Sequence, residues 1–181
     1  MNVAERVKEL SAEGIGHARE EAVVRFIDWF NDKPQTYWLF AAAHYNWGYG
    51  PLPLYFMVRE PQCSIAVAKQ IFWLGAPDDI WLWEGCWAAD YEMDLEKKLL
   101  LEINERACAG GFVRDGLNPT ANCYDERIAA RIARQPCAKA PPVAAVLLAG
   151  FEPFDPPIPE VDHPEWNQDV ADIFGDLGTG F

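Results

Sequence analysis

Residues 36–45, TYWLFAAAHY, constrain the fold most, because nearly every side chain in this stretch is apolar. The segment predicts a helix, and a helix without a polar face is normally buried. It is followed by residues 46–50, whose glycines can take the positive φ of a helix stop, and then by Pro51 and Pro53, which prevent continuation. Other elements must therefore surround this helix.

Apolar residues recur at helical spacing along most of the chain. Tyr91, Leu95, Leu99 and Ile103 lie four residues apart in a segment that ends at Gly110 and Gly111. Ser64 is a plausible N-cap for the helix that Gly75 terminates. The full set of predicted helices covers residues 3–10, a stretch within 17–33, 36–45, 54–59, 65–74, a short helix starting at Pro77, 88–109, 124–134 and 143–149.

No convincing run of alternating β-branched residues occurs, since the one alternating stretch, WLWEGCW at 81–87, is short and broken by Gly85. The fold class is therefore predicted to be all-α. Repeated helix pairs raise the alternative of a solenoid, but no fixed period of about 30 to 45 residues is found. We expect one irregular bundle of about seven to eight helices in residues 1–150.

Residues 151–181 differ from the rest, because they contain many carboxylates and no lysine or arginine. Five prolines predict that the first half of this segment is an extended strap. Trp166, Val170, Ile173 and Leu177 then follow at helical spacing, which predicts a short amphipathic terminal helix with an acidic back. Its apolar stripe packs either on the chain's own core or on a partner. The carboxylates could also face Arg127, Arg131 and Arg134.

The net charge of −13 argues against binding to nucleic acid or to an anionic membrane, since both require basic patches. Such a chain suits a partner with a basic surface. The first residues lack the apolar core of a secretory signal, and the longest apolar run, 141–151, is far shorter than the ~20 residues that span a bilayer. We expect a soluble, cytoplasmic protein.

Catalytic and metal-binding signatures are missing from the sequence. The five cysteines are an odd number without a Cys-x-x-Cys pair, so neither a disulfide framework nor a zinc cluster is predicted. No cofactor-binding motif occurs, and no cofactor or metal is expected. The one nucleophile and base worth naming are Cys63, near a helix N-terminus, and His44. The chain is therefore predicted not to be an enzyme.

The aromatic stretch at residues 45–50 has two interpretations. It could bind a ligand, because Tyr45, Asn46 and Trp47 stand where the chain must turn. The favoured interpretation is architectural: Asn46 is a polar helix stop, Gly48 and Gly50 form the turn, and Trp47 covers the next helix.

Residues 38–87 carry a pattern that is known from one family. It consists of an Asn-Trp-x-x-Gly turn at Asn46, Trp47 and Gly50, a Pro-x-Cys step at Pro61 and Cys63, and an Ala-x-x-x-Phe-Trp helix that contains Ala68, Phe72 and Trp73. In this pattern the chain resembles the bacterial family catalogued as domain of unknown function 4274. The resemblance implies a small helical domain that is often found alongside secreted toxin systems, and it carries no catalytic residue over.

These features favour a cytoplasmic bacterial immunity protein that neutralises a cognate secreted toxin, possibly a nuclease, by occluding its active site with an acidic surface. The alternatives are an adaptor or chaperone for a secreted effector and, less favoured, a cysteine-dependent hydrolase. The predicted partner-binding residues are the acidic clusters and one tryptophan, namely Asp78, Asp79, Glu84, Asp90, Glu92, Asp94, Asp155, Glu160, Asp162, Glu165, Trp166, Asp169 and Asp172.

Overall fold

The computed structural model describes residues 2–15, 20–87, 94–120, 124–134 and 136–152. Within these ranges the chain is helical and forms no β-strand, only an isolated bridge between Ser64 and Val113. The prediction of an all-α fold is therefore confirmed.

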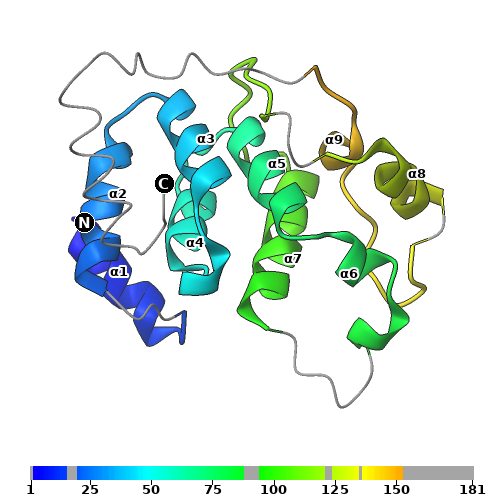
Figure 1. Ribbon diagram of the computed structural model, residues 1–181, viewed down its shortest axis with the longest axis horizontal. Helices are drawn as coiled ribbons and strands as arrows, with labels where there is room; N and C mark the ends of the chain where they lie inside the picture. The colour runs from blue at the N-terminus through cyan, green and yellow to red at the C-terminus, as the bar shows by residue number, and fades with distance from the viewer. Residues whose placement is uncertain (1, 16–19, 88–93, 121–123, 135, 153–181) are drawn as a thin grey trace.

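The helices of the described ranges are short and follow one another closely. The α-helices are α1 (Val3–Ala12), α2 (Glu20–Asn31), α3 (Gln35–His44), α4 (Leu52–Arg59), α5 (Ile65–Leu74), α6 (Asp78–Trp81), α7 (Leu95–Cys108), α8 (Glu126–Arg134) and α9 (Ala145–Leu148). Two 3₁₀ turns, η1 (Trp47–Tyr49) and η2 (Glu84–Trp87), lie between them. Figure 1 shows α1 and α2 at one side of the molecule, α6, α8 and α9 at the other, and α3, α4, α5 and α7 between them.

Several predicted helix boundaries are confirmed and two need correction. Ser64 caps α5 by accepting a hydrogen bond from the backbone N–H of Val67. The helix predicted from residue 88 begins instead at Leu95, because Asp94 is extended and its carboxylate accepts the N–H of Lys97. Residues 88–93 lie outside the described ranges. The helix predicted for residues 143–149 is reduced to the four residues of α9.

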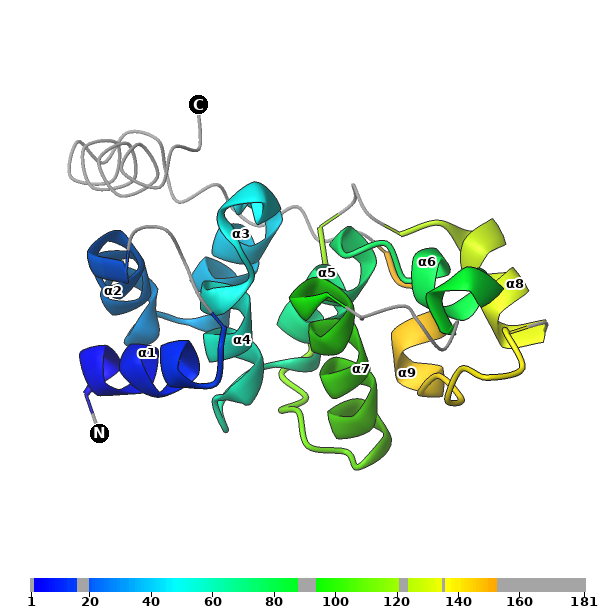
Figure 2. The same ribbon diagram turned by 90° about the horizontal axis from the view of Figure 1, so that it is seen from below.

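The most enclosed helices are α4 and α5. Every residue from Leu52 to Val58 is buried, as is every residue from Ala66 to Trp73. In the view of Figure 2, α5 and α7 stand between the half that contains α1 to α4 and the group of α6, α8 and α9. The core therefore lies at the centre of the molecule, and α4 and α5 contribute much of it.

Helix α3 is only partly buried, although its sequence is apolar nearly all round. Trp38 and Leu39 are buried between α3 and its neighbours α2 and α5, whereas Tyr37 and Phe40 are half-buried and His44 is exposed. The expectation of a fully buried helix is wrong in this respect, because α3 lies in an outer layer of the bundle. Its outer face is aromatic.

The stretch after α3 forms a tight turn. The side-chain oxygen of Asn46 accepts the N–H of Gly48 at 2.9 Å, and the hydroxyl of Tyr45 donates to the carbonyl of Gly50 at 2.6 Å. Gly50 has φ of 96°, a conformation that favours glycine. The Trp47 ring extends to the end of α5, where it lies beside Gly75.

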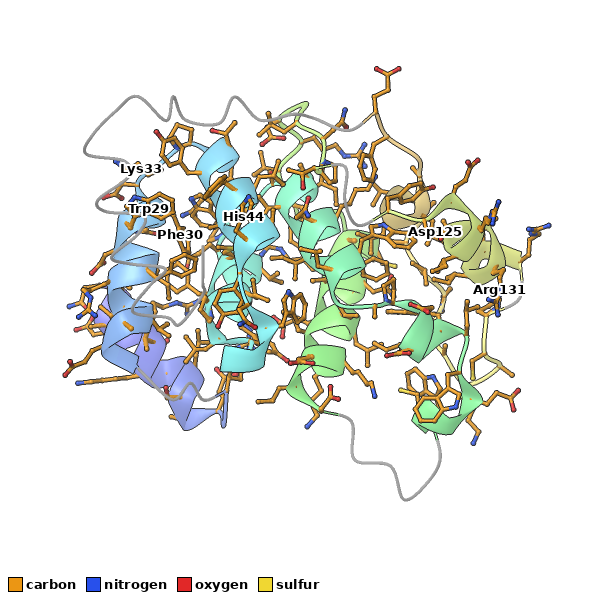
Figure 3. All side chains as sticks on the ribbon, viewed as in Figure 1. Trp29, Phe30, Lys33, His44, Asp125 and Arg131 are labelled. Atoms are coloured by element: carbon orange, nitrogen blue, oxygen red, sulfur yellow. The ribbon has the colours of Figure 1, made fainter. Side chains whose placement is uncertain are left out.

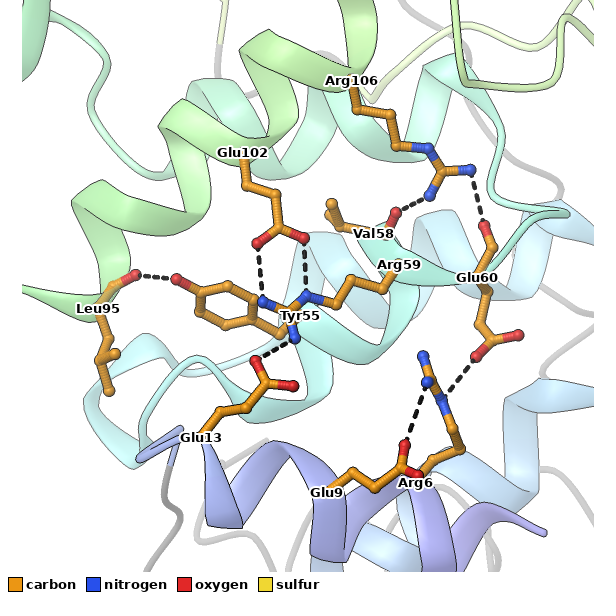
Figure 4. Close-up of polar contacts among 10 residues, drawn as sticks. All are labelled: Arg6, Glu9, Glu13, Tyr55, Val58, Arg59, Glu60, Leu95, Glu102 and Arg106. Carbon is orange, nitrogen blue, oxygen red and sulfur yellow. Dashed lines mark hydrogen bonds and ion pairs between the residues drawn. The ribbon is translucent and has the colours of Figure 1, made fainter. Parts of the chain in front are cut away.

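A network of arginines joins three helices across the bundle (Figure 4). Arg59 at the end of α4 makes a two-pronged contact with Glu102 of α7, with N···O distances of 2.7 and 2.9 Å, and a third contact with Glu13 beside α1 at 2.6 Å. Arg106 of α7 donates to the carbonyls of Val58 and Glu60. These bonds satisfy carbonyls that the end of α4 leaves without helical partners.

Side chains from α5, α6 and α7 hold the segment that follows α8. The indole N–H of Trp73 donates to the carbonyl of Leu147 at 3.0 Å, and that of Trp81 donates to the carbonyl of Pro141 at 2.8 Å. The amide of Asn104 donates to Pro142 at 2.9 Å and accepts from Ala144 at 2.8 Å. Residues 141–147 are thus fixed mainly by tertiary bonds.

Candidate protein-interaction surface

The described part of the predicted acidic cluster lies around α6, η2 and the start of α7. Asp78 and Asp79 lie in the first turn of α6, where the positive end of the helix dipole favours carboxylates. Glu84 begins η2, and Asp94 caps α7. Asp79, Glu84 and Asp94 are exposed, whereas Asp78 is half-buried. The remaining predicted residues lie outside the described ranges: Asp90, Glu92, Asp155, Glu160, Asp162, Glu165, Trp166, Asp169 and Asp172.

Trp83 is the feature of this region that the sequence patterns do not single out. Its side chain is 49% exposed, and it is one of two exposed large apolar residues in the described ranges. Its neighbours Trp81 and Trp87 are anchored instead, since their indole N–H groups donate to the carbonyls of Pro141 and Ile80. No local pattern in WLWEGCW distinguishes Trp83 from Trp81, because residues two apart in an alternating stretch share a side.

Close packing from below positions the Trp83 ring. A Cβ atom on Gly85 would lie 2.5 Å from the ring, so the indole covers this glycine at the closest approach that a backbone allows. The ammonium of Lys97 lies 5.8 Å from the ring centroid, within range of a cation–π contact, and 3.7 Å from the carboxylate of Asp94. The Trp83 ring therefore packs against Gly85 and lies beside Lys97, which in turn pairs with Asp94.

The carboxylates of this region raise the pKa values of neighbouring acidic groups. Burial raises the pKa of the Cys86 thiol, and the nearby carboxylates of Asp94 and Asp79 raise it further against the opposing effect of Lys97. Burial also raises the pKa of Glu96, with Asp94 adding to the effect. Asp79 at the start of α6 and Asp94 at the start of α7 thus both lie within electrostatic range of the buried Cys86 thiol.

The environment of Cys63 is unfavourable for a nucleophile that His44 would activate as a base. The Cys63 side chain is fully buried, and this burial raises the pKa of its thiol to about 12, which outweighs its place just before the α5 N-terminus. His44 lies at the end of α3 with its ring 4.4 Å from the Phe40 ring. At neutral pH Cys63 is a thiol packed in the core.

The described ranges offer little for other kinds of site. Within them, no group of three or more histidine, cysteine, aspartate or glutamate side chains is arranged to hold a metal ion. A shallow groove of about 450 Å³ lies between α1 and α2, and its lining mixes alkyl and charged side chains, namely Ala4, Val7, Lys8, Glu21, Val24 and Arg25. None of the described helices combines the length and apolarity that crossing a membrane requires.

The chain matches no protein-family model, no curated protein and no solved structure. The resemblance of residues 38–87 to domain of unknown function 4274 therefore stays a prediction.

Proposed function

We propose that this chain is a non-catalytic immunity protein that binds a cognate secreted toxin and occludes its active site. The observation that carries the proposal is Trp83, a half-exposed aromatic side chain that packs on Gly85 and lies beside Lys97, in a region that also exposes the carboxylates of Asp79, Glu84 and Asp94. Binding energy at protein interfaces concentrates in such aromatic anchors, with surrounding polar residues excluding water. The acidic rim then selects the partner.

The charge of the whole chain narrows the class of toxin. A net charge of −13 attracts a basic surface over a distance set by the ionic strength and speeds association with it. An enzyme that acts on nucleic acid needs a basic substrate-binding face. We therefore favour a nuclease as the toxin, with Trp83 seated beside its catalytic cleft and the carboxylates taking the place of substrate phosphates.

The test is coexpression of this chain with the product of the adjacent gene. We expect that product to arrest growth when it is expressed alone, to be harmless together with this chain, and to copurify with it. A product that is harmless alone, or that does not copurify, contradicts the proposal. A harmless product that does copurify would instead indicate an adaptor or chaperone.

Two variants test whether Trp83 and its rim form the interface. W83A should weaken the affinity by roughly 30-fold or more, the effect of removing a hot-spot aromatic residue. D79N/E84Q/D94N should lower the association rate about tenfold at low salt, because it removes steering charge, while the asparagine introduced at position 94 can still cap α7.

Matched controls separate these effects from general ones. V113S removes the other exposed large apolar side chain, and D28N/E105Q/E126Q removes the same number of exposed carboxylates elsewhere. Both should bind within about threefold of the original chain, since surface changes outside an interface are nearly neutral. If the controls lose as much affinity as the variants, the surface formed by Trp83 and the carboxylates of Asp79, Glu84 and Asp94 is not the interface.

A further inference from the structure

The outer face of α2 and α3 carries two neighbouring rows of side chains. Along α2 and the turn after it, Arg25, Trp29 and Lys33 are four residues apart and share one side. Along α3, Tyr37, Phe40 and His44 are spaced by three and four. Figure 3 labels Trp29 and Lys33 near α2 and His44 on α3.

Ring contacts make the two rows one surface. The Trp29 and Tyr37 ring centroids are 5.9 Å apart, and the Lys33 ammonium lies 5.9 Å from the Tyr37 centroid. The centroid of the Phe40 ring is 4.4 Å from that of the exposed His44 ring. Trp29, Tyr37 and Phe40 are half-buried, so part of each ring lies outside the core.

The two helices contribute different charges to this surface. Helix α3 contains no carboxylate, whereas α2 and the turn after it carry Arg25 and Lys33 together with the exposed carboxylates of Glu21, Asp28 and Asp32. In a chain of net charge −13, an aromatic surface on which Lys33 lies beside the Tyr37 ring, and to which α3 adds no carboxylate, suits an amphipathic helix that carries carboxylates.

The chain itself contains such a segment. Residues 153–181 have no lysine or arginine, and Trp166, Val170, Ile173 and Leu177 are placed at helical spacing. In the same pattern of 100° per residue, the carboxylates gather on one flank of the apolar stripe, at Glu165, Asp169, Asp172 and Asp176.

The length and origin of the segment fit an intramolecular contact. Its first residues follow Phe151, whose ring lies 4.6 Å from the ammonium of Lys69 on α5. Helix α3 packs on α5, and α2 packs on α3, so the surface is one to two helix spacings away, or about 10 to 20 Å. Residues 153–165 can extend over about 40 Å, which is more than enough.

We propose that the aromatic face of α2 and α3 is the docking site of the chain's own C-terminal segment, residues 153–181. The stripe of Trp166, Val170, Ile173 and Leu177 meets the rings of Trp29, Tyr37 and Phe40, and the acidic flank meets Arg25 and Lys33. A tethered segment has an effective concentration in the millimolar range, which favours it over a second copy or a foreign helix.

The experiment combines site-specific photo-crosslinking with hydrogen exchange on the full chain. A benzoylphenylalanine residue is placed at position 37 or, as a control, at position 133 on the exposed side of α8. We expect position 37 to crosslink to peptides from residues 153–181 within a species of monomer mass, and position 133 not to do so. Amides of residues 166–177 should exchange at least about tenfold more slowly than in V170D/I173D.

The alternatives give different results. Crosslinks from position 37 that occur only in a species of twice the monomer mass would overturn the proposal in favour of a second copy. Amides of residues 166–177 that exchange at the same rate in the original chain and in V170D/I173D would also overturn it, and would leave the segment available to a foreign partner. A V170D/I173D variant that failed to fold would exchange its amides fast. Equal rates can therefore arise only if residues 166–177 are equally unprotected in the original chain.

Discussion

Gly75 shows that a single missing methyl group determines how closely two helices approach. A Cβ atom at this position would lie 2.7 Å from Cδ2 of Leu100 on α7 and 2.8 Å from Cη2 of Trp47. Gly75 is the C-cap of α5, as predicted, but its φ of −81° is open to any residue, so the backbone conformation does not require a glycine here. The glycine is required by the closeness of α7 and the Trp47 ring.

G75A should lower the free energy of unfolding by about 1 to 3 kcal/mol, the usual penalty for overpacking a core. In urea titrations, the double variant G75A/L100A should lose less than the sum of the two single losses, because the shortened side chain at position 100 makes room for the new methyl group. Gly110 provides the control: it has φ of +68°, and a Cβ atom there would meet nothing within 4 Å, so G110A and L100A should be additive. Additive losses for G75A and L100A would refute the steric explanation.

At the scale of elements, Arg106 joins the end of one helix to another. It lies on α7 and donates to the carbonyls of Val58 and Glu60 at the C-terminus of α4, and also to Gly111 just beyond its own helix. Its guanidinium stands 4.4 Å from the ring centroid of Phe112. A planar fork of donors can serve these three carbonyls together, which a lysine ammonium cannot do.

R106A and R106K should both destabilise the fold, R106A by about 2 to 3 kcal/mol, because hydrogen bonds from a charged donor are lost and carbonyls are left unsatisfied. The amides at the end of α4, residues 57–60, should exchange faster with solvent. R114A removes an exposed arginine close by in the sequence and should change stability by less than about 0.5 kcal/mol. Equal stability of R106K and the original chain would show that charge alone suffices.

Elements are predictable where the local pattern determines them. Ser64 is recognisable as a cap, because capping depends on a residue and the three that follow it. The predicted start of α7 is wrong, since Tyr91 continues the apolar spacing while Asp94 offers a competing cap. The partners of Arg106 lie 46 and 48 residues away in the sequence, so no local pattern could indicate them.

For the whole molecule, the burial of a cysteine thiol and of tyrosine hydroxyls predicts how the free energy of unfolding depends on pH. Burial raises the pKa of Cys63 to about 12, and it also raises the pKa values of Tyr45 and Tyr55. The unfolded chain therefore releases these protons at lower pH than the folded one. Stability is fully present below about pH 9 and is lost as the pH rises through the folded pKa values.

C63A should flatten this dependence. Between about pH 9 and 11 the original chain should lose roughly 1.4 kcal/mol more per pH unit than C63A, the contribution of one titrating group. V67A is the control, because it opens a cavity in the same helix-lined core without removing a proton, so it should lower stability and keep the slope. Urea midpoints measured at several pH values give both quantities. Equal slopes for C63A and the original chain would contradict the assignment.

The candidate surface is predictable from the sequence only in its charge. The carboxylates of Asp78, Asp79 and Glu84 follow from composition and spacing, but the chain contains eight tryptophans and no local rule tells which one remains outside. Trp81 and Trp83 are two residues apart in the same stretch, yet one donates to Pro141 and the other is half-exposed. That difference depends on where residues 141–147 lie in the finished fold.

The bonds that hold residues 141–147 also bear on how this segment can vary. Trp73, Trp81 and Asn104 all donate to backbone carbonyls, which every amino acid supplies. A substitution within the segment can therefore leave these acceptors in place, whereas an inserted or deleted residue between Pro141 and Leu147 would shift at least one of them away from its donor. Among related chains, this stretch is expected to change freely in composition while keeping its length.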